Sequence, residues 1–221
     1  SIPDVFRSFK WGWLPVGPLI TQRFDSAQKI TKVRVPILVV HGSEDSLIRP
    51  ELAAGQPHRP TAIVSSDLPR ALQTAQAIAA ATGLPITTSA LLHERNFGDL
   101  RGQPYDTLGF DPLTREEAPP NGESIPQFAA RCAAAWAWVL QQHAALGSGA
   151  VLAVVSHGLV IKQWLLHGTL QVPAALALPE RMSNTSLTIA TAAARHTVHL
   201  IDCTAHLGGA VQADAKSLSG G

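Results

Sequence analysis

The stretch that decides the fold is Val154-Val155-Ser156-His157-Gly158, which ends an apolar run beginning at Val151. A run of this length and composition predicts a buried strand of a sheet. The run stops at a histidine and a glycine. Polar side chains that follow a buried strand lie at the edge where open α/β sheets bind their ligands. His157 is therefore a candidate functional residue at the carboxyl end of a central strand.

Strand and helix patterns alternate along the rest of the chain. Apolar and β-branched runs predict strands at 35–40, 62–64, 85–91, 151–155, 186–190 and 198–203. Three longer helices are predicted. The first runs from Pro69 to Gly83 with Ser66 or Asp67 as its cap, the second from the Ser124/Gln127 capping box to about Gly147, and the third over 159–170. Shorter helices are predicted at 25–30 and 49–55. This alternation predicts an α/β protein, a three-layer α/β/α sandwich with a mostly parallel central sheet.

Composition narrows the classes of function. The 221 residues are 46% hydrophobic and 15% charged, with a formal charge of +1, which fits one sizeable core and favours neither a nucleic acid nor a membrane as partner. No apolar run reaches the roughly 18 residues of a membrane span, and no signal peptide is evident, so we expect a cytoplasmic protein. Two cysteines, Cys132 and Cys203, are too few for a disulfide scaffold. No metal-ligand spacing occurs, so we expect neither a metal nor a cofactor.

Three residues have the chemistry that phosphoryl transfer needs: a cation, an acid and a histidine. Arg70 falls in the first turn of a predicted helix, where backbone amides and the helix dipole add to its charge. Glu94 follows a predicted strand, and burial would raise the pKa of its carboxyl and make it a proton donor. His157 would donate to a phosphoryl oxygen or act as a nucleophile. Taken singly, each also fits an ordinary structural role.

The three residues stand in motifs that follow one another in order. These are Ser65-Ser66-Asp67-Leu68-Pro69-Arg70-Ala71, then Glu94-Arg95-Asn96-Phe97-Gly98, then Asn121-Gly122-Glu123-Ser124, then the His157 motif. Over about residues 61–208 this order resembles the histidine phosphatase (phosphoglycerate mutase-like) superfamily. The resemblance implies that Arg70 binds phosphate, that Glu94 is the catalytic acid and base, and that His157 is catalytic and holds the phosphoryl group.

The resemblance also points to the nucleophile. In that family it is the histidine of an Arg-His-Gly motif that ends the first strand; it forms a phosphohistidine that water hydrolyses, with no metal. Here the first predicted strand ends Val39-Val40-His41-Gly42, so His41 is the expected nucleophile. Val40 stands in place of the arginine, and the connection to the Ser-Ser motif is about half the usual length. We therefore expect a weak phosphomonoesterase acting on a small phosphorylated substrate.

The beginning of the chain resembles a different family. Phe24-Asp25-Ser26 and the run from Val35 to Asp45 are similar to the later part of α/β-hydrolases, which implies that Asp45 is the acid of a serine triad. No G-x-S-x-G elbow is present to supply the serine. We expect a hydrolase-like segment at 1–54 that supplies the strand at 35–40, a phosphatase-like domain at 55–208 and a flexible tail at 209–221.

Two alternatives to the phosphatase remain open. One is a phosphatase-like fold that binds a phosphate or a partner without catalysis. The other is an esterase-like serine hydrolase that uses Asp45. In either case the short connection after residue 41 leaves apolar surface, so we expect a second subunit to cover it and form a homo-oligomer. The aromatic segment from Phe6 to Leu14 would either make that contact or fold back over the sheet.

Overall fold

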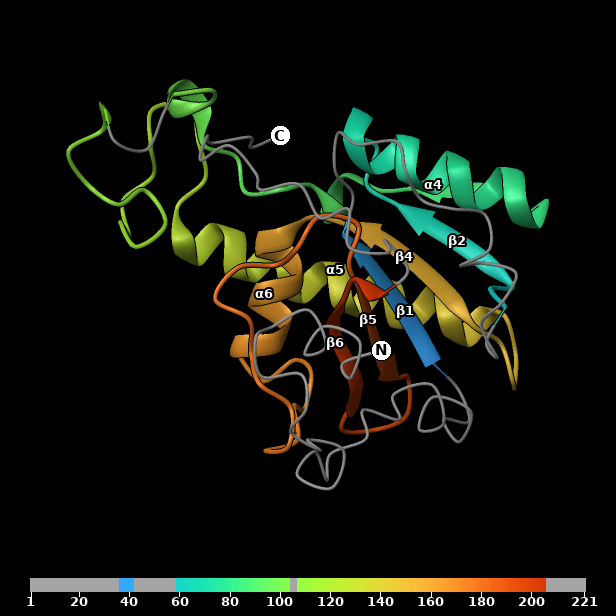
Figure 1. Cartoon of the computed structure of the whole chain (residues 1–221). Coiled ribbons are helices and arrows are strands. Elements are labelled where there is room, and N and C mark those ends of the chain that lie inside the picture. Colours follow the sequence, from blue (N-terminus) through green and yellow to red (C-terminus); the bar gives the residue numbers. More distant parts are fainter. Residues whose placement is uncertain (1–35, 42–58, 104–106, 206–221) are drawn as a thin grey trace, which may run out of the picture.

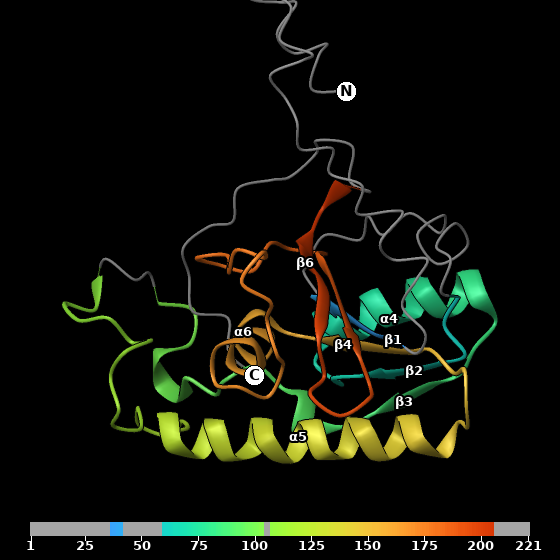
Figure 2. The ribbon, with the colours of Figure 1, turned by 90° about the horizontal axis from the view of Figure 1, so that it is seen from below.

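The computed structural model describes residues 36–41, 59–103 and 107–205. For residues 36–41 only the path of the backbone is described. These residues form a six-stranded sheet in the order β3-β2-β4-β1-β5-β6, with helices on both faces (Figures 1 and 2). The predicted three-layer α/β architecture is confirmed.

The sheet is mostly parallel, as the alternation of elements predicts. Its strands are β1 (Pro36–His41), β2 (Ala62–Ser65), β3 (Ile86–Thr88), β4 (Leu152–Ser156), β5 (Leu187–Thr191) and β6 (Val198–Cys203). Neighbours among β1 to β4 pair in parallel, whereas β5 runs antiparallel to both β1 and β6. The strand β1 lies between β4 and β5, and its register with β4 sets His41 opposite Ser156. The carboxyl ends of β1, β2 and β4 therefore meet at one edge of the sheet.

Alternating side chains of β4 separate the core into two layers. Leu152 and Val154 pack with the helices α5 (Ile125–Ala145) and α6 (Gly158–Leu166), whereas Ala153 and Val155 pack with α4 (Pro69–Thr82). All four side chains are at most 1% exposed. A strand buried on both faces has no polar face, which is the reason for the continuous apolar run that ends at His157.

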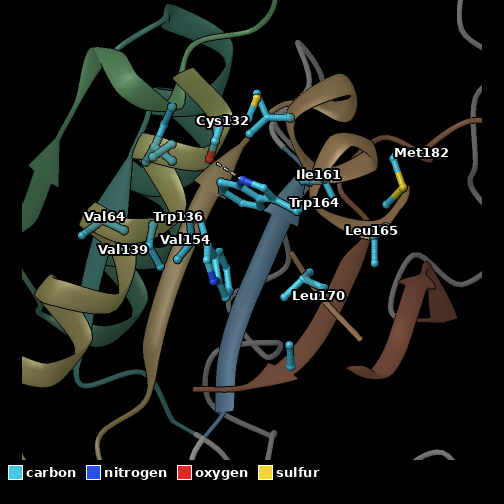
Figure 3. Packing of buried hydrophobic residues seen from close by; sticks show 14 of the residues in the cluster. Val64, Cys132, Trp136, Val139, Val154, Ile161, Trp164, Leu165, Leu170 and Met182 are labelled. Carbon is cyan, nitrogen blue, oxygen red and sulfur yellow. Dashed lines mark hydrogen bonds between the residues drawn. The ribbon is translucent and has the colours of Figure 1, made fainter. Parts of the chain in front are cut away.

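The layer beneath α5 and α6 contains the largest buried side chains (Figure 3). Trp164 of α6 is fully buried and its indole Nε1–H donates to the backbone oxygen of Cys132 at 2.8 Å. Trp136 of α5 packs against Trp164 with ring centroids 5.2 Å apart. Burial raises the pKa of the Cys132 thiol to about 12, so Cys132 is a core residue without thiolate chemistry at neutral pH.

Helix ends follow local capping signals at α5 and at the end of α4. The Ser124 hydroxyl accepts a hydrogen bond from the Gln127 amide at 3.2 Å, and the Gln127 side chain accepts one from the Ser124 amide at 2.9 Å. This is the predicted capping box. The helix α4 ends at Gly83, whose φ of 74° lies in the left-handed region that favours glycine.

Three predicted element boundaries were wrong. The N-cap of α4 is Leu68 rather than Ser66 or Asp67, because the Ser66 hydroxyl bonds the Leu68 amide and His157 instead. The strand predicted at 85–91 is limited to β3, because the Ser89 hydroxyl caps a 3-10 turn over Ala90–Leu92. The helix predicted at 159–170 ends at Leu166, and Gly168 then turns the chain with a φ of 76°.

Several expectations fall outside the described residues. They are the helices at 25–30 and 49–55, the contact segment from Phe6 to Leu14, the loop that carries Asp45, and the tail at 209–221. Among the helices that the structure describes, none is both long and apolar enough to cross a membrane.

Candidate active site

The candidate site is built where β2 and β4 end. Ser65 and Ser66 stand at the end of β2, and His157 follows β4 directly; all three are fully buried. Arg70 lies in the first turn of α4, the helix that follows β2. The parallel pairing of β2 with β4 brings these residues together although they are far apart in the chain.

His157 connects Arg70 to Ser66. The Arg70 Nε–H donates to His157 Nδ1 at 3.1 Å, and His157 Nε2 lies 2.8 Å from the Ser66 hydroxyl. A guanidinium group only donates hydrogen bonds, so Nδ1 is an acceptor here and the ring proton is on Nε2. His157 Nε2–H therefore donates to Ser66.

Glu94, the candidate acid, has only 9% of its surface exposed. Its Oε1 accepts a hydrogen bond from the Arg95 amide at 2.9 Å, and its Oε2 accepts one from the Leu159 amide, in the first turn of α6, at 3.2 Å. Loss of hydration by burial raises the pKa of the Glu94 carboxyl above its ordinary value. The two amides and the charges of Arg70 and Arg131 oppose that shift without cancelling it. The expected rise in the pKa of Glu94 is thus present.

A hydrogen-bonded pair of side chains next to the site joins two of its loops. The His93 Nε2 contacts the Asp67 carboxylate, which links the residue before Glu94 to the residue after Ser66. The hydrogen bond from His93 lowers the pKa of the Asp67 carboxyl. Sequence reasoning missed this pair as well as Arg131 of α5. The available signal was position in the chain, because Asp67 lies within one motif and His93 directly precedes another.

The structure brings Arg70, Glu94 and His157 to one edge, as predicted. It places the backbone of His41 at the same edge, through the pairing of His41 with Ser156. Asp45 lies outside the described residues. Within 59–103 and 107–205, no group of three His, Cys, Asp or Glu side chains is arranged to hold a metal ion.

Comparison with known proteins defines the class to which this fold and site belong. Residues 51–201 match the histidine phosphatase superfamily (branch 1), so the chain is a member of that superfamily. The predicted family is confirmed. The match begins at residue 51 and leaves the hydrolase-like segment at 1–54 a prediction.

Individual relatives agree with the family. Over 141 residues the chain is 36% identical to the probable phosphoglycerate mutase GpmB of Yersinia pestis, an alignment that covers 58% of this chain and 61% of that protein. The chain thus spans less than two thirds of the length of the curated relatives that it matches. The structure is similar to a mycobacterial glucosyl-3-phosphoglycerate phosphatase (TM-score 0.55, 26% identity, 71% of this chain and 89% of that one). A phosphoglycerate mutase from Bacillus anthracis shares the fold at 19% identity (TM-score 0.62, 80% and 97% covered).

Proposed function

We propose that this chain is a phosphomonoesterase that works through a phosphohistidine, without a metal. The observation that supports this most is the part-buried contact between Arg70 and the fully buried His157, close to the buried carboxyl of Glu94. Arg70 and His157 would bind the phosphoryl oxygens and stabilise the charge that develops on them in the transition state. His41 would be the nucleophile, and the domain at 55–208 would supply the other groups.

The reaction would proceed in two steps. A ring nitrogen of His41 attacks phosphorus with its lone pair, the bond between phosphorus and the ester oxygen breaks, and Glu94 gives its proton to the leaving alcohol. Water then attacks the phosphohistidine, the Glu94 carboxylate takes a proton from that water, and inorganic phosphate leaves. The raised pKa of Glu94 suits the first step, because the carboxyl must carry a proton when the alcohol departs.

One feature of the sequence favours a second candidate function. Val40 stands where the family has an arginine, so one phosphate donor is absent at that position. Loss of one such donor removes about 3 kcal/mol of transition-state stabilisation. We therefore expect slow turnover, and the alternative is a phosphate-binding protein that does not turn over.

The relatives suggest which substrates to test. The names of both a curated relative and a solved neighbour contain phosphoglycerate. We propose that the substrate is a small phosphate ester of this kind, and that 3-phosphoglycerate and p-nitrophenyl phosphate are the first compounds to measure.

The decisive experiment is hydrolysis of both compounds with a chelator present, by the wild type and by the His41→Ala and His157→Ala variants. Trapping a phosphorylated protein that is labile to acid, and that His41→Ala no longer forms, would support the proposal. A phosphorylated His41→Ala variant would assign the nucleophile to another residue. Phosphate binding without turnover would support the second candidate. Inhibition by a serine-directed phosphonate would instead support the esterase alternative.

A further inference from the structure

Arg131 of α5 contacts the backbone on both sides of the candidate acid. Its Nη1 donates to the backbone oxygens of Leu91 at 2.9 Å and His93 at 2.8 Å, and its Nη2 donates to that of Glu94 at 3.2 Å. One side chain from a 21-residue helix therefore satisfies three carbonyl groups of a segment with little regular structure. The backbone of Glu94 is thus bonded to Arg131, while its carboxyl bonds the amides of Arg95 and Leu159.

Glu123 fixes the orientation of the Arg131 guanidinium. The Arg131 Nε donates to one carboxylate oxygen of Glu123 at 2.9 Å and Nη2 donates to the other at 2.8 Å. The two side chains are 19% and 15% exposed, so water screens this pair much less than a surface pair. A bidentate pair allows one orientation of the guanidinium plane, and that plane points the remaining donors at the carbonyls.

The same Glu123 also binds the segment that follows Glu94. Its carboxylate accepts a hydrogen bond from the Asn96 amide at 3.3 Å, and its own amide donates to the Asn96 oxygen at 2.7 Å. The Arg95 Nε donates to the Glu123 backbone oxygen at 3.2 Å. Arg131 and Glu123 together therefore hold the chain before and after the acid.

We infer that Arg131, fixed by Glu123, is a positioning residue that holds Glu94 in line with the leaving oxygen of the substrate. The inference rests on the proposed function, in which Glu94 protonates that oxygen. Neither residue needs to touch the substrate. Proton transfer depends steeply on placement, and a displacement of about 1 Å can lower a rate by about 100-fold.

Two substrates separate this role from a general loss of folded protein. An alkyl phosphate, such as glycerol 3-phosphate, releases a strongly basic alkoxide that needs a proton as it departs. p-Nitrophenyl phosphate releases a stable phenolate that needs little help. A misplaced Glu94 should lower kcat/KM, which reports the first step, far more for the first substrate than for the second, whereas a lower fraction of folded enzyme lowers both equally.

The test compares Arg131→Lys and Arg131→Met with the wild type. Glu94→Gln, which removes the acid itself, gives the largest loss of activity that misplacing the acid can cause. Lysine keeps the charge but lacks the planar fork, so Arg131→Lys should lower kcat/KM for the alkyl phosphate about 10-fold and for p-nitrophenyl phosphate at most about threefold. Arg131→Met should approach Glu94→Gln if it folds. Arg115→Met is the matched control, because Arg115 pairs with Glu117 at 2.6 Å on the surface, where the side chains are 53% and 77% exposed.

Each outcome decides a separate point. An unchanged ratio of the two kcat/KM values in Arg131→Lys overturns the positioning role while leaving the phosphatase in place. A wild type without turnover overturns the proposed function. The positioning role of Arg131 is then tested by hydrogen exchange instead of by kinetics. The amides of Arg95 and Leu159, which bond the Glu94 carboxyl, should lose protection in Arg131→Lys while the amides of α4 keep theirs. Unchanged protection of both amides would refute the role.

Discussion

At the scale of single residues, Glu94 shows how burial prepares a carboxyl for acid catalysis. Two backbone amides point at its oxygens and favour the charged form, yet the loss of hydration has the larger effect and raises the pKa. The carboxyl therefore holds its proton to a higher pH than an exposed glutamate. The proposed acid role uses that property directly.

This raised pKa predicts how stability depends on pH. Between the ordinary pKa of a glutamate and the raised one, the folded state of the wild type binds more protons than the unfolded state, so its free energy of unfolding falls as pH rises. Glu94→Gln resembles the protonated carboxyl and has no such loss. We expect similar stabilities for the two proteins at about pH 4 and a more stable variant at neutral pH, measured by urea unfolding. A difference that stays constant with pH would contradict the shift.

The candidate site was predictable from sequence only in part. Arg70, Glu94 and His157 each lie in a motif beside a strand or helix end, so the sequence could offer them as candidates, and the structure brings them to one edge of the sheet. The partners that fix them could not. The contact of Asp67 with His93 and the donors of Arg131 join residues far apart in sequence, and only the fold brings them together.

At the scale of elements, the loop after Glu94 depends on a close approach of two backbones. A Cβ atom at Gly98 would lie 2.0 Å from the Pro120 oxygen and 2.6 Å from the Gly122 nitrogen, and its φ of 51° is left-handed. The Asn96 side chain accepts a hydrogen bond from the Gly98 amide at 2.9 Å, which closes the turn. The loop thus packs against the residues just before α5.

Gly98→Ala should displace this loop, and Gly109→Ala serves as the control. Gly109 has a similar φ of 67°, but nothing lies within 4 Å of an added Cβ. Strain alone should cost Gly109→Ala about 1 kcal/mol of unfolding free energy, whereas the clash should cost Gly98→Ala about 3 kcal/mol or more. Denaturant unfolding of both variants checks the difference. Equal losses would show that the backbones do not meet.

The sequence predicted which helices and strands are present better than it predicted the residues at which they end. The capping box at Ser124 and the glycine at 83 mark helix ends through local chemistry, which a sequence displays. The end of α6 was missed because the apolar pattern continues to Leu170, and Leu170 is buried in the core although the helix has already stopped. The period of apolar residues shows which side chains are buried. A buried residue that follows the end of a helix therefore fits the same pattern as a residue in one more helical turn.

At the scale of the whole molecule, the early strand β1 occupies the interior of the sheet. Its partners are β4 on one side and β5 on the other, and Val39 stands opposite Val154 and Thr188. Within the described part of the chain, the edge strand β3 pairs only with β2. The candidate nucleophile His41 ends this interior strand, so the sheet and the site depend on the same segment.

Proline substitutions test the place of β1. Val39→Pro removes an amide from a strand with neighbours on both sides and should cost about 3 kcal/mol or more of unfolding free energy. Thr87→Pro changes the edge strand β3 and should cost clearly less. Circular dichroism during urea unfolding gives both values. A Val39→Pro protein as stable as Thr87→Pro would mean that the strand at 36–41 is not interior.

The strand order also determines when the protein can fold as it leaves the ribosome. The partners of β1 are made more than a hundred residues later, because β4 begins at Leu152 and β5 at Leu187. Among the described strands, only β2 and β3 can pair before β4 emerges. A nascent chain therefore carries the apolar strand β1 without its sheet partners until β4 is made, and we expect it to need a chaperone or a slow, late folding step rather than stepwise folding from the N-terminus.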